Sequence, residues 1–443
     1  MKRILLAAIP LLLSCSMNIA QDVQTVSSET KNLRKCGTME YLEQQKALDP
    51  SVELQMQQLE EFTRQWIKDH PDGSGDKTII TVPVVVHVVW NTSAQNISDA
   101  RVQEQINILN RDYGGTNPHS MGSFSTSLKA NTELQFCLAQ RTPAGVATNG
   151  IEKRQTTVTS FTTNNAVKYY SQGGLSAWDP TKYMNIWVCN LGQYLCGYAQ
   201  FPYAAQGGGI NATYGVVIHY QYFGVTGATT PYNGGGTTTH EIGHCFNLYH
   251  IWGDDSGGSD PYTCSSGNCC GGTDNCTDTP NQSVATDGSH TGELTDACAT
   301  ASPGIMYMNF MDYTYDVSYT NFTPNQKARI QPLFVTGAPL VSLKTSNGCT
   351  PGVGIEETES ISDINIYPNP SNGLVNVKFT LSDASDVVIS VSNILGDEIA
   401  KIGKQNVSSV DIPINLANQS AGIYFVKIQI GTQIITQKVS LIK

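Results

Sequence analysis

The chain has 443 residues, 40% of them hydrophobic and only 14% charged, with a formal net charge of −11. This length exceeds one compact core and allows two or three domains. The negative charge argues against nucleic acid as a partner, because a protein that binds phosphates needs a basic surface. Forty glycines with few charges favour a loop-rich, β-containing exported protein over a helical cytosolic enzyme.

Residues 1–20 have the pattern of a secretory signal peptide. A basic start is followed by an apolar run over residues 4–13, which is too short to anchor the chain across a bilayer. We expect cleavage after Ala20. The four residues that end at Cys15 also resemble a bacterial lipobox, in which Cys15 would carry a lipid, but we favour the interpretation that Cys15 simply belongs to the signal peptide. Since no other segment approaches the required length, we expect no transmembrane segment.

Residues 21–77 are predicted to hold an amphipathic helix followed by an exposed linker. Between Ser51 and His70, apolar side chains such as Leu59 and Trp66 recur at helical spacing. The stretch Pro71–Asp76 then combines proline, glycine and aspartate, which is typical of a linker.

Residues 78–349 indicate one α+β domain with a mixed β-sheet. A β-branched run from Ile79 to Trp90 predicts a buried strand. Ser98 is expected to cap an amphipathic helix that begins at Asp99. The other predicted elements are strands over 134–139, 183–189 and 215–220, and a helix over 237–246. A strand-rich half therefore precedes this last helix, and an irregular half follows it.

The segment from His240 to His250 reads H-E-x-x-H followed by a third histidine six residues on. His240 and His244 are four residues apart, which places both imidazoles on one face of a helix. Six residues is not a whole number of turns, so the helix must end near Asn247 for His250 to reach the same point. Three neutral imidazoles suit zinc and leave a fourth position open for water, with Glu241 placed as a general base. The motif therefore predicts hydrolysis of peptide bonds.

This motif resembles H-E-x-x-H-x-x-G-x-x-H of the metzincin zinc peptidases, except that Asn247 replaces the glycine. Asparagine tolerates left-handed backbone angles best after glycine, so we expect the turn to form at a cost of about 1 kcal/mol. The string N-F-M-D-Y, residues 309–313, looks like the methionine turn of the pappalysin branch of this family. The resemblance implies that the three histidines ligate Zn2+ and that Met311 lies beneath the metal site.

Two further residues take roles from this resemblance. In pappalysin-like enzymes, the tyrosine two residues after the methionine hydrogen-bonds the tetrahedral intermediate, which implies this role for Tyr313. In members that cleave before arginine, an aspartate five residues after the methionine lines the S1′ pocket, and Asp316 stands at that position. A buried carboxylate there would select arginine or lysine at P1′ by charge pairing. The alternative is an ordinary surface aspartate in a loop.

The twelve cysteines suggest one metal ligand and a set of disulfides. Removal of Cys15 with the signal peptide leaves an odd number. Cys36 lies in R-x-C-G-T, a string similar to the pro-segment of pappalysin-like zymogens, in which a thiolate ligates the zinc in place of water. The resemblance implies that residues 21–77 are a pro-segment and that the precursor is latent. The alternative is a free or mispaired thiol in a disordered leader. The ten remaining cysteines are expected to form disulfides whose connectivity stays open.

The stretch 254–283 is rich in glycine, cysteine and aspartate and shows no periodicity. Within it, residues 274–280 resemble the D-x-x-x-D-T-P segment that helps pappalysins bind calcium. The resemblance implies Ca2+ ligands among Asp274, Asp278 and Thr279, since carboxylates and backbone carbonyls in a tight loop suit this ion. The alternative is a polar loop with turn-forming residues.

The last part of the chain indicates a linker over residues 350–363 and a small all-β, immunoglobulin-like sandwich over residues 364–443. Its markers are Y-P-N-P from Tyr367 and G-I-Y-F from Gly422. These strings are similar to the type A C-terminal sorting domain of the type IX secretion system of Bacteroidetes. The resemblance implies export through the periplasm by that machinery, with release or attachment at the cell surface. The alternative is a generic immunoglobulin-like spacer.

Together these features predict a secreted, zymogenic zinc endopeptidase that acts on protein or peptide substrates. The alternative from a different class is a catalytically weak or inactive surface-binding protein on the same scaffold, which only Asn247 favours. An intact Glu241 speaks against that alternative, because a decayed site has no reason to retain its base.

Overall fold

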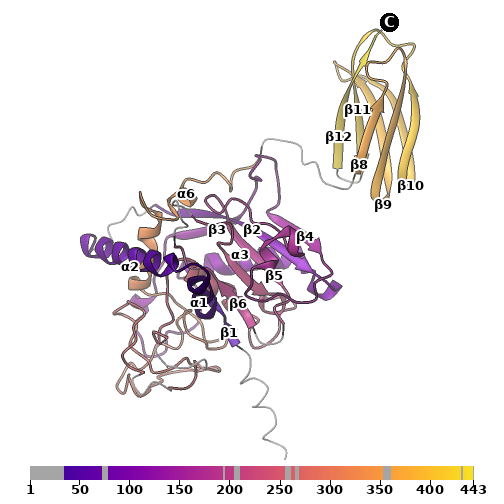
Figure 1. Ribbon diagram of the computed structural model, residues 1–443. Helices are drawn as coiled ribbons and strands as arrows, with labels where there is room; N and C mark the ends of the chain where they lie inside the picture. The colour runs from indigo at the N-terminus through magenta and orange to yellow at the C-terminus, as the bar shows by residue number, and fades with distance from the viewer. Residues whose placement is uncertain are drawn as a thin grey trace, which may run out of the picture. The chain divides into compact units, whose positions relative to one another are not determined.

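A computed structural model of the chain describes residues 34–71, 78–192, 195–203, 210–254, 261–264, 269–352, 361–430 and 433–442. The chain divides into two compact units (Figure 1). The first comprises Met1–Leu138 and Ile151–Asn347, and the second comprises Ala139–Gly150 and Gly348–Lys443. The predicted signal peptide and Cys15 lie outside the described residues. No helix within the described ranges is long and apolar enough to cross a membrane.

A seven-stranded mixed sheet forms the centre of the first unit, with strand order β1-β6-β7-β5-β2-β3 and with β4 paired to β2 (Figure 1). The strands are β1 (Arg34–Cys36), β2 (Ile80–Trp90), β3 (Leu134–Leu138), β4 (Ile151–Gln155), β5 (Met184–Cys189), β6 (Leu195–Ala199) and β7 (Val216–His219). β2 confirms the predicted buried strand and pairs in parallel with β3, β4 and β5. Its residues from Val82 to Val89 are all buried, which suits a run of β-branched residues covered on both faces.

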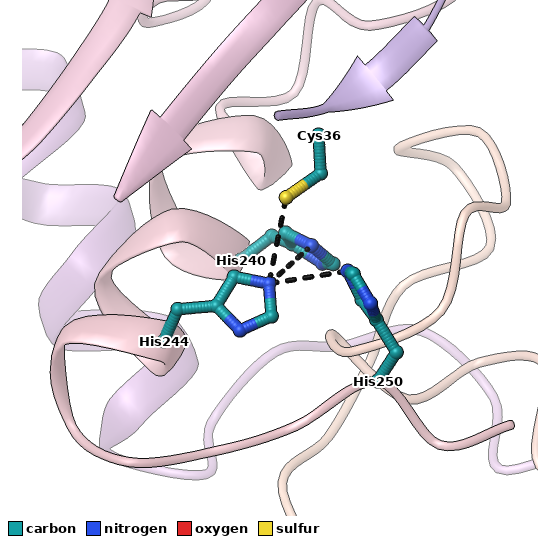
Figure 2. A group of neighbouring side chains, drawn as sticks. All are labelled: Cys36, His240, His244 and His250. Carbon is teal, nitrogen blue, oxygen red and sulfur yellow. Dashed lines mark hydrogen bonds between the residues drawn. The ribbon is translucent and has the colours of Figure 1, made fainter. Parts of the chain in front are cut away.

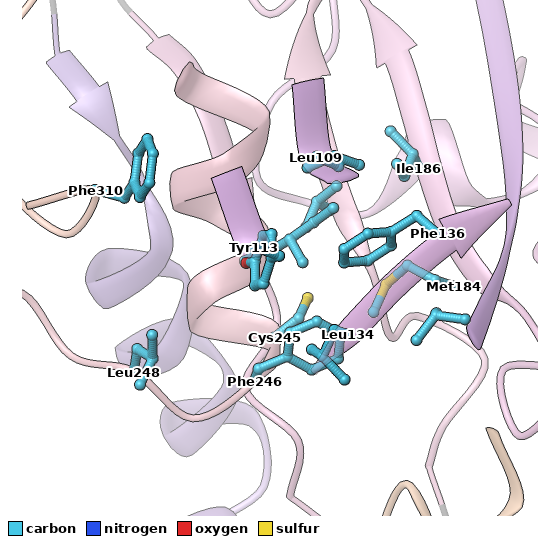
Figure 3. Close-up of a cluster of buried hydrophobic side chains, with 14 of the residues drawn as sticks. Leu109, Tyr113, Leu134, Phe136, Met184, Ile186, Cys245, Phe246, Leu248 and Phe310 are labelled. Atoms are coloured by element: carbon cyan, nitrogen blue, oxygen red, sulfur yellow. The ribbon is translucent and has the colours of Figure 1, made fainter. Parts of the chain in front are cut away.

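One face of this sheet packs against helices α3 (Asp99–Tyr113) and α4 (Gly236–Cys245). Figure 3 shows the shared core, in which Tyr113 of α3, Phe136 of β3 and Phe246 just after α4 lie together. α3 begins where predicted, because the Ser98 hydroxyl accepts a hydrogen bond from the Arg101 amide. The opposite face of the sheet carries a second cluster that includes Trp187, Tyr198 and Val217. Neighbouring residues of a strand point to opposite faces, so the sheet separates these two cores.

The segment that precedes β2 is part of the first unit and adds an edge strand to its sheet. β1 is an edge strand parallel to β6. Helices α1 (Thr38–Leu48) and α2 (Ser51–Asp69) follow it. α2 confirms the helix predicted from the spacing of apolar residues. The sequence interpretation missed β1 and α1, because a strand of three residues has no period to detect and few apolar residues of α1 are buried.

Beyond α4 the chain is mostly irregular, as expected. The helices in this half are α5 (Pro324–Ile330) and α6 (Val341–Lys344). Single turns of 3-10 helix occur at η2 (Ser93–Gln95), η3 (Thr126–Leu128), η4 (Ala166–Lys168), η5 (Tyr170–Gln172), η6 (Tyr220–Tyr222) and η7 (Gln331–Phe334).

The cysteines follow the expected pairing only in part. Disulfides join Cys264 to Cys269 and Cys270 to Cys298, and Cys137 and Cys349 are disulfide-bonded as well. Cys189, Cys245 and Cys276 are buried thiols. The expectation that all ten cysteines form disulfides is therefore wrong. Cys189 and Cys245 sit in the two cores on either side of the sheet, where a thiol packs as a small hydrophobic group.

The second unit is built on five antiparallel strands with their own hydrophobic core. They are β8 (Ile361–Tyr367), β9 (Leu374–Asn393), β10 (Glu398–Asn415), β11 (Gly422–Ile430) and β12 (Gln433–Leu441). β9 pairs with β8, β10 and β11, so the strands form one continuous sheet. Register shifts between β9 and β10 lie on both sides of Val407 and between Glu398 and Ala400, and such irregularities allow long strands to bend. The predicted small all-β domain is thereby confirmed.

Candidate active site

Three histidine rings meet with their Nε2 atoms facing one another (Figure 2). His240 and His244 lie one turn apart on α4, and their Nε2 atoms are 3.2 Å apart. His250 arrives from beyond the helix, and its Nε2 atom lies 3.1 Å from that of His244. All three side chains are buried. The helical spacing and the chain reversal thus bring the three predicted ligands to one point.

The chain reverses at Asn247. Asn247 has a φ of 63°, the left-handed conformation that glycine would adopt at this position. The amide of Leu248 donates back to the carbonyl of Gly243, which closes the end of the helix. The departure from the family motif therefore does not prevent the turn.

Two side chains of α2 and one of α5 hold this turn. The carbonyl oxygen of Asn247 accepts hydrogen bonds from Nε and Nη2 of Arg329, at 3.3 and 3.1 Å. The same guanidinium pairs with both carboxylate oxygens of Glu60 on α2, at 2.9 and 2.8 Å. The side-chain amide of Asn247 donates to the hydroxyl of Thr63, also on α2, at 3.3 Å. The N-terminal segment therefore contacts the turn that delivers the third histidine.

The protonation of the three rings follows from the hydrogen-bond partners of their Nδ1 atoms. The Nδ1 atoms of His240, His244 and His250 lie 2.6, 2.7 and 2.7 Å from Phe310 O, Leu248 O and Asp254 Oδ1. A carbonyl or carboxylate oxygen can only accept, so each Nδ1 carries the proton and each Nε2 presents a lone pair. Burial and the other two rings also lower the pKa of His244, which keeps it neutral. Three lone pairs that face one another without a proton between them fit a bound cation.

Cys36 supplies a fourth donor. Its Sγ lies 3.5 Å from His244 Nε2, and the four donor atoms all lie within 4.8 Å of one another (Figure 2). A tetrahedral zinc with ordinary bond lengths separates two nitrogen ligands by about 3.3 Å and a sulfur from a nitrogen by about 3.6 Å. Burial and the nearby Glu241 raise the pKa of the Cys36 thiol, so a thiolate there needs a cation beside it. The donor set and its spacing fit Zn2+.

Glu241 faces the same point from α4 and is fully buried. Its Oε2 accepts a hydrogen bond from the Thr38 hydroxyl at 2.8 Å and lies 3.4 Å from Cys36 Sγ. Strand β6 passes close to Glu241. A Cβ atom on Gly197 of that strand would lie 3.0 Å from the Glu241 side chain. The N-terminal segment therefore contacts the Oε2 atom of Glu241 with two of its side chains.

Met311 and Tyr313 lie against the histidines from the downstream half of the chain. A Cβ atom on Gly243 would meet the sulfur of Met311 at 2.5 Å, so Met311 packs directly against α4 between its two histidines. The ring of Tyr313 lies 5.0 Å from that of His250, edge to face. Burial raises the pKa of Tyr313 well above its usual value, so this tyrosine is a neutral phenol that can donate a hydrogen bond.

Asp316 lies at the start of α4. Its Oδ2 accepts hydrogen bonds from the amides of Gly234 and Gly236, at 2.6 and 3.2 Å. The side chain is buried rather than on the surface, so the alternative of an ordinary surface aspartate is wrong. Gly236 is one helical turn before His240, which places this carboxylate one turn from the first of the three histidines.

The proposed calcium segment forms a compact loop. Oδ1 of Asp274 accepts from the amide of Cys276, and Oδ2 accepts from the Thr279 hydroxyl, at 3.0 and 2.8 Å. Burial raises the pKa of Asp274 to about 7. Asp278 instead directs its oxygens at α5, where they accept from the Thr323 hydroxyl at 2.7 Å and the Asn325 amide at 2.9 Å. Both carboxylate oxygens of Asp278 therefore have hydrogen-bond donors without a metal ion. Asp274 is buried with a raised pKa, so a nearby cation would stabilise its ionised form.

Sequence reasoning missed several residues that support the site. Asp254 orients His250, and its place four residues after that histidine was the one local signal. Asp112 on α3 is fully buried and accepts a hydrogen bond at 2.8 Å from Thr239, the neighbour of the first histidine. Thr38 and Arg329 act across more than 80 residues of sequence, and no local pattern announces such contacts.

Two family models match the chain. Residues 168–334 match a peptidase model described as pregnancy-associated plasma protein-A. Residues 365–443 match the secretion system C-terminal sorting domain.

Solved structures and curated proteins show the same likeness. A promirolysin variant of Tannerella forsythia is 40% identical, with a TM-score of 0.62 over 70% of this chain and 97% of that chain. Mature mirolysin of that organism in complex with a cleaved peptide is 44% identical, with a TM-score of 0.55 over 60% of this chain and 96% of that chain. An extracellular metalloprotease of Arthroderma gypseum is 29% identical over 256 residues, which cover 58% of this chain and 72% of that protein.

Proposed function

Because this chain belongs to the pregnancy-associated plasma protein-A family of peptidases and is an extracellular zinc metalloendopeptidase, we propose that His240, His244 and His250 hold the zinc and that Glu241 is the general base. The observation that carries this proposal is the convergence of three Nε2 lone pairs beside the Glu241 carboxylate. Zinc bound at such a site lowers the pKa of a water molecule and polarises the scissile carbonyl.

The protein groups around this point have separate tasks. Glu241 receives the proton of the attacking water at Oε2 and later gives it to the amine that leaves. Tyr313 donates a hydrogen bond from its phenol to the oxygen of the tetrahedral carbon. Phe310 O, Leu248 O and Asp254 keep the imidazoles in one tautomer and orientation.

Cleavage of casein by the activated chain tests this proposal. We expect cleavage that a zinc chelator abolishes and added zinc restores. Glu241→Gln should lower kcat by about 1,000-fold, because the carboxylate that moves the proton is gone. The matched control is Glu293→Gln at an exposed carboxylate outside the site, which should keep full activity. Chelator-resistant cleavage, or a fully active Glu241→Gln enzyme, would refute these assignments.

We further propose that residues 21–77 keep the precursor latent, with Cys36 as a zinc ligand. β1 covers the edge of β6, Cys36 Sγ stands among the donors, and Thr38 holds the Oε2 atom of Glu241. A Cys36→Ser precursor should therefore cleave casein or cut itself, whereas the wild-type precursor should remain intact. If both precursors stay equally latent, steric cover alone causes latency and the thiolate has no role.

We also propose that Asp316 selects arginine or lysine at P1′. A buried carboxylate at the start of α4 supports a cationic pocket, although part of its charge is already bound to two backbone amides. Asp316→Asn should lower kcat/KM for P1′ arginine at least about tenfold relative to P1′ leucine in a peptide library. Asp287→Asn at an exposed aspartate is the control. An unchanged P1′ profile would remove Asp316 from the pocket.

Calcium remains a second proposed cofactor, with Asp274 as the ligand that the structure supports best and Asp278 and Thr279 as weaker candidates. A bound Ca2+ would reverse the effect of burial on Asp274 and keep it ionised. Calcium should raise the melting temperature of the wild-type precursor, and Asp274→Asn should remove this increase. Equal calcium responses of both proteins would place any calcium site elsewhere.

The chain carries a secretion system C-terminal sorting domain, which indicates export by the type IX system of Bacteroidetes and an extracellular location. We propose the boundaries 1–20 for the signal peptide, 21–77 for the pro-segment, 78–349 for the peptidase domain and 350–363 for the linker before the sorting domain.

A further inference from the structure

Lys168 is buried in the first unit, and among the residues that the structure describes no carboxylate forms an ion pair with it. Lys168 ends the short helix η4 and is only 1% exposed. Its Nζ donates a hydrogen bond to the carbonyl of Thr213 at 2.6 Å. Three aromatic rings surround the ammonium, with centroids 5.0 Å away for Tyr41, 5.3 Å for Trp187 and 5.2 Å for Tyr198. These distances are those of cation–π contacts, so the rings take the place of a counter-charge.

One of these three rings belongs to the proposed pro-segment. Tyr41 lies in the first turns of α1 and is 1% exposed. Its hydroxyl donates to Asn165 Oδ1 at 2.9 Å and reaches Gln200 Oε1 at 3.2 Å. Its ring packs at 5.0 Å against that of Tyr198. Removal of residues 21–77 would therefore take away one ring and leave Lys168, Trp187, Tyr198, Asn165 and Gln200, which we call the tyrosine site.

The two acceptors of the tyrosine site, Asn165 Oδ1 and Gln200 Oε1, are oriented to accept a hydrogen bond from a phenol. The side-chain amide nitrogen of Gln200 donates to Asn211 Oδ1 at 2.9 Å, so Oε1 must be the atom that faces Tyr41. The Thr213 hydroxyl donates to the same Oε1 at 2.7 Å. A ring without a hydroxyl would leave the buried Gln200 Oε1 and the half-buried Asn165 Oδ1 with fewer donors, which disfavours phenylalanine.

The tyrosine site adjoins the strand on which the proposed pro-segment lies. Tyr198 is part of β6, and Gln200 follows that strand directly. Gly197, the residue before Tyr198, faces Glu241 on the other side of the sheet. A peptide paired with β6 would direct alternate side chains to the two faces. One set would approach Glu241, and the other would approach the tyrosine site.

We propose that the tyrosine site of the activated enzyme binds a tyrosine side chain of an extended peptide substrate, at a fixed number of residues from the scissile bond. The substrate ring takes the place that Tyr41 occupies in the precursor, completes the aromatic surroundings of Lys168 and donates its hydroxyl to Asn165 and Gln200. The proposal rests on the proposed function, since it requires a peptidase whose pro-segment is removed.

A positional scan with quenched fluorescent peptides tests the proposal. The full-length precursor is produced and then activated by removal of the pro-segment. Each peptide position receives tyrosine, phenylalanine or leucine in turn. At one position, tyrosine should raise kcat/KM about tenfold over phenylalanine, the effect of one buried hydrogen bond with its partner left unmade. Gln200→Leu should bring that ratio close to one, because it removes an acceptor of the phenol. Lys168→Met should lower kcat/KM for tyrosine and phenylalanine alike, because either ring would contact the ammonium. The matched control is Lys182→Met at a half-exposed lysine, which should change neither the ratio nor the rates.

A second measurement avoids any effect of substitutions on folding. A peptide of residues 34–50 with Cys36→Ser competes with substrate for the activated wild-type enzyme. Its Tyr41→Phe form should inhibit about tenfold less well. Equal inhibition by the two peptides, or a tyrosine preference that persists in Gln200→Leu, would overturn the tyrosine site while the peptidase stands. Absence of chelator-sensitive cleavage would refute the proposed function itself and the substrate site with it.

Discussion

At the scale of single residues, Asn247 determines how the third histidine reaches the site. A left-handed residue is required there, and asparagine adopts this conformation at φ 63°. The full-length chain adds a second requirement, because the side-chain amide of this residue donates to Thr63. Glycine would meet the first requirement and lose the second, which gives asparagine a physical role at a position where the family motif has glycine.

Substitutions at this position separate the two requirements. Asn247→Ala should lower the stability of the precursor by about 1 kcal/mol, because alanine pays more than asparagine for left-handed angles. Asn247→Gly should change stability by less than about 0.5 kcal/mol, since easier backbone angles offset the lost contact with Thr63. Urea unfolding of both variants in a Glu241→Gln background, which prevents self-cleavage, checks the prediction. Equal losses for alanine and glycine would show that the backbone angle is not the constraint.

Lys168 makes the stability of the precursor depend on pH. Burial lowers the pKa of this lysine from 10.5 to about 7. The unfolded chain therefore binds the proton more tightly, and the folded protein pays a penalty that is complete below about pH 7 and fades as pH rises toward 10. By linkage this penalty is about 5 kcal/mol at most. The advantage in melting temperature of Lys168→Met over wild type should shrink as pH rises from 7 to 10. A difference that stays constant over this range would contradict the lowered pKa.

At the scale of secondary-structure elements, α2 does more than cover the surface of the peptidase domain. Its Glu60 pairs with Arg329, whose side chain is 2% exposed, and this arginine holds the carbonyl of Asn247. A buried guanidinium that loses its carboxylate keeps the cost of its desolvation. Release of α2 would thus leave Arg329 without its carboxylate, close to the turn that carries the third histidine.

Two neighbouring carboxylates on α2 test this contact. Glu60→Gln should destabilise the precursor by about 2 kcal/mol and speed its activation, because Arg329 stays buried without an ionised partner. The control is Glu61→Gln, which removes a surface pair with Arg64 whose side chains are 62% and 67% exposed, and it should change little. Activation rates followed by gel, together with melting temperatures, decide between them. Equal effects of the two variants would exclude a special role for Glu60.

The elements themselves were largely predictable. β2, α2 and α3 carry periodic or continuous apolar patterns over eleven or more residues, and each begins within one residue of its predicted start. β1 and α1 were missed, although β1 brings Cys36 to the histidines. Its structure is imposed by β6, since a three-residue strand exists only through its partner.

At the scale of the whole molecule, the two units have separate cores and separate tasks. A chain that ends at Gly352 keeps every residue of the site and loses residues 353–443. It should cleave casein as fast as the full chain after activation and should accumulate in the periplasm rather than outside the cell. Fractionation of a type IX host and casein assays measure both effects. Normal export of the shortened chain would contradict the sorting role, and loss of activity would show that the second unit supports the first.

The histidine cluster and the main elements of the fold follow from local patterns in the sequence. The spacing of His240, Glu241 and His244 is local, so a helix converts it directly into geometry. The surroundings of that cluster come from tertiary contacts instead. Thr38 and Cys36 reach Glu241 across more than 200 residues, and Arg329 of α5 supports Asn247. Tyr41 of α1 closes a cage of rings around Lys168, while Cys189 and Cys245 remain thiols in two cores instead of joining in disulfides. Each of these contacts depends on the order of the strands in the sheet. A local pattern of residues does not predict that order.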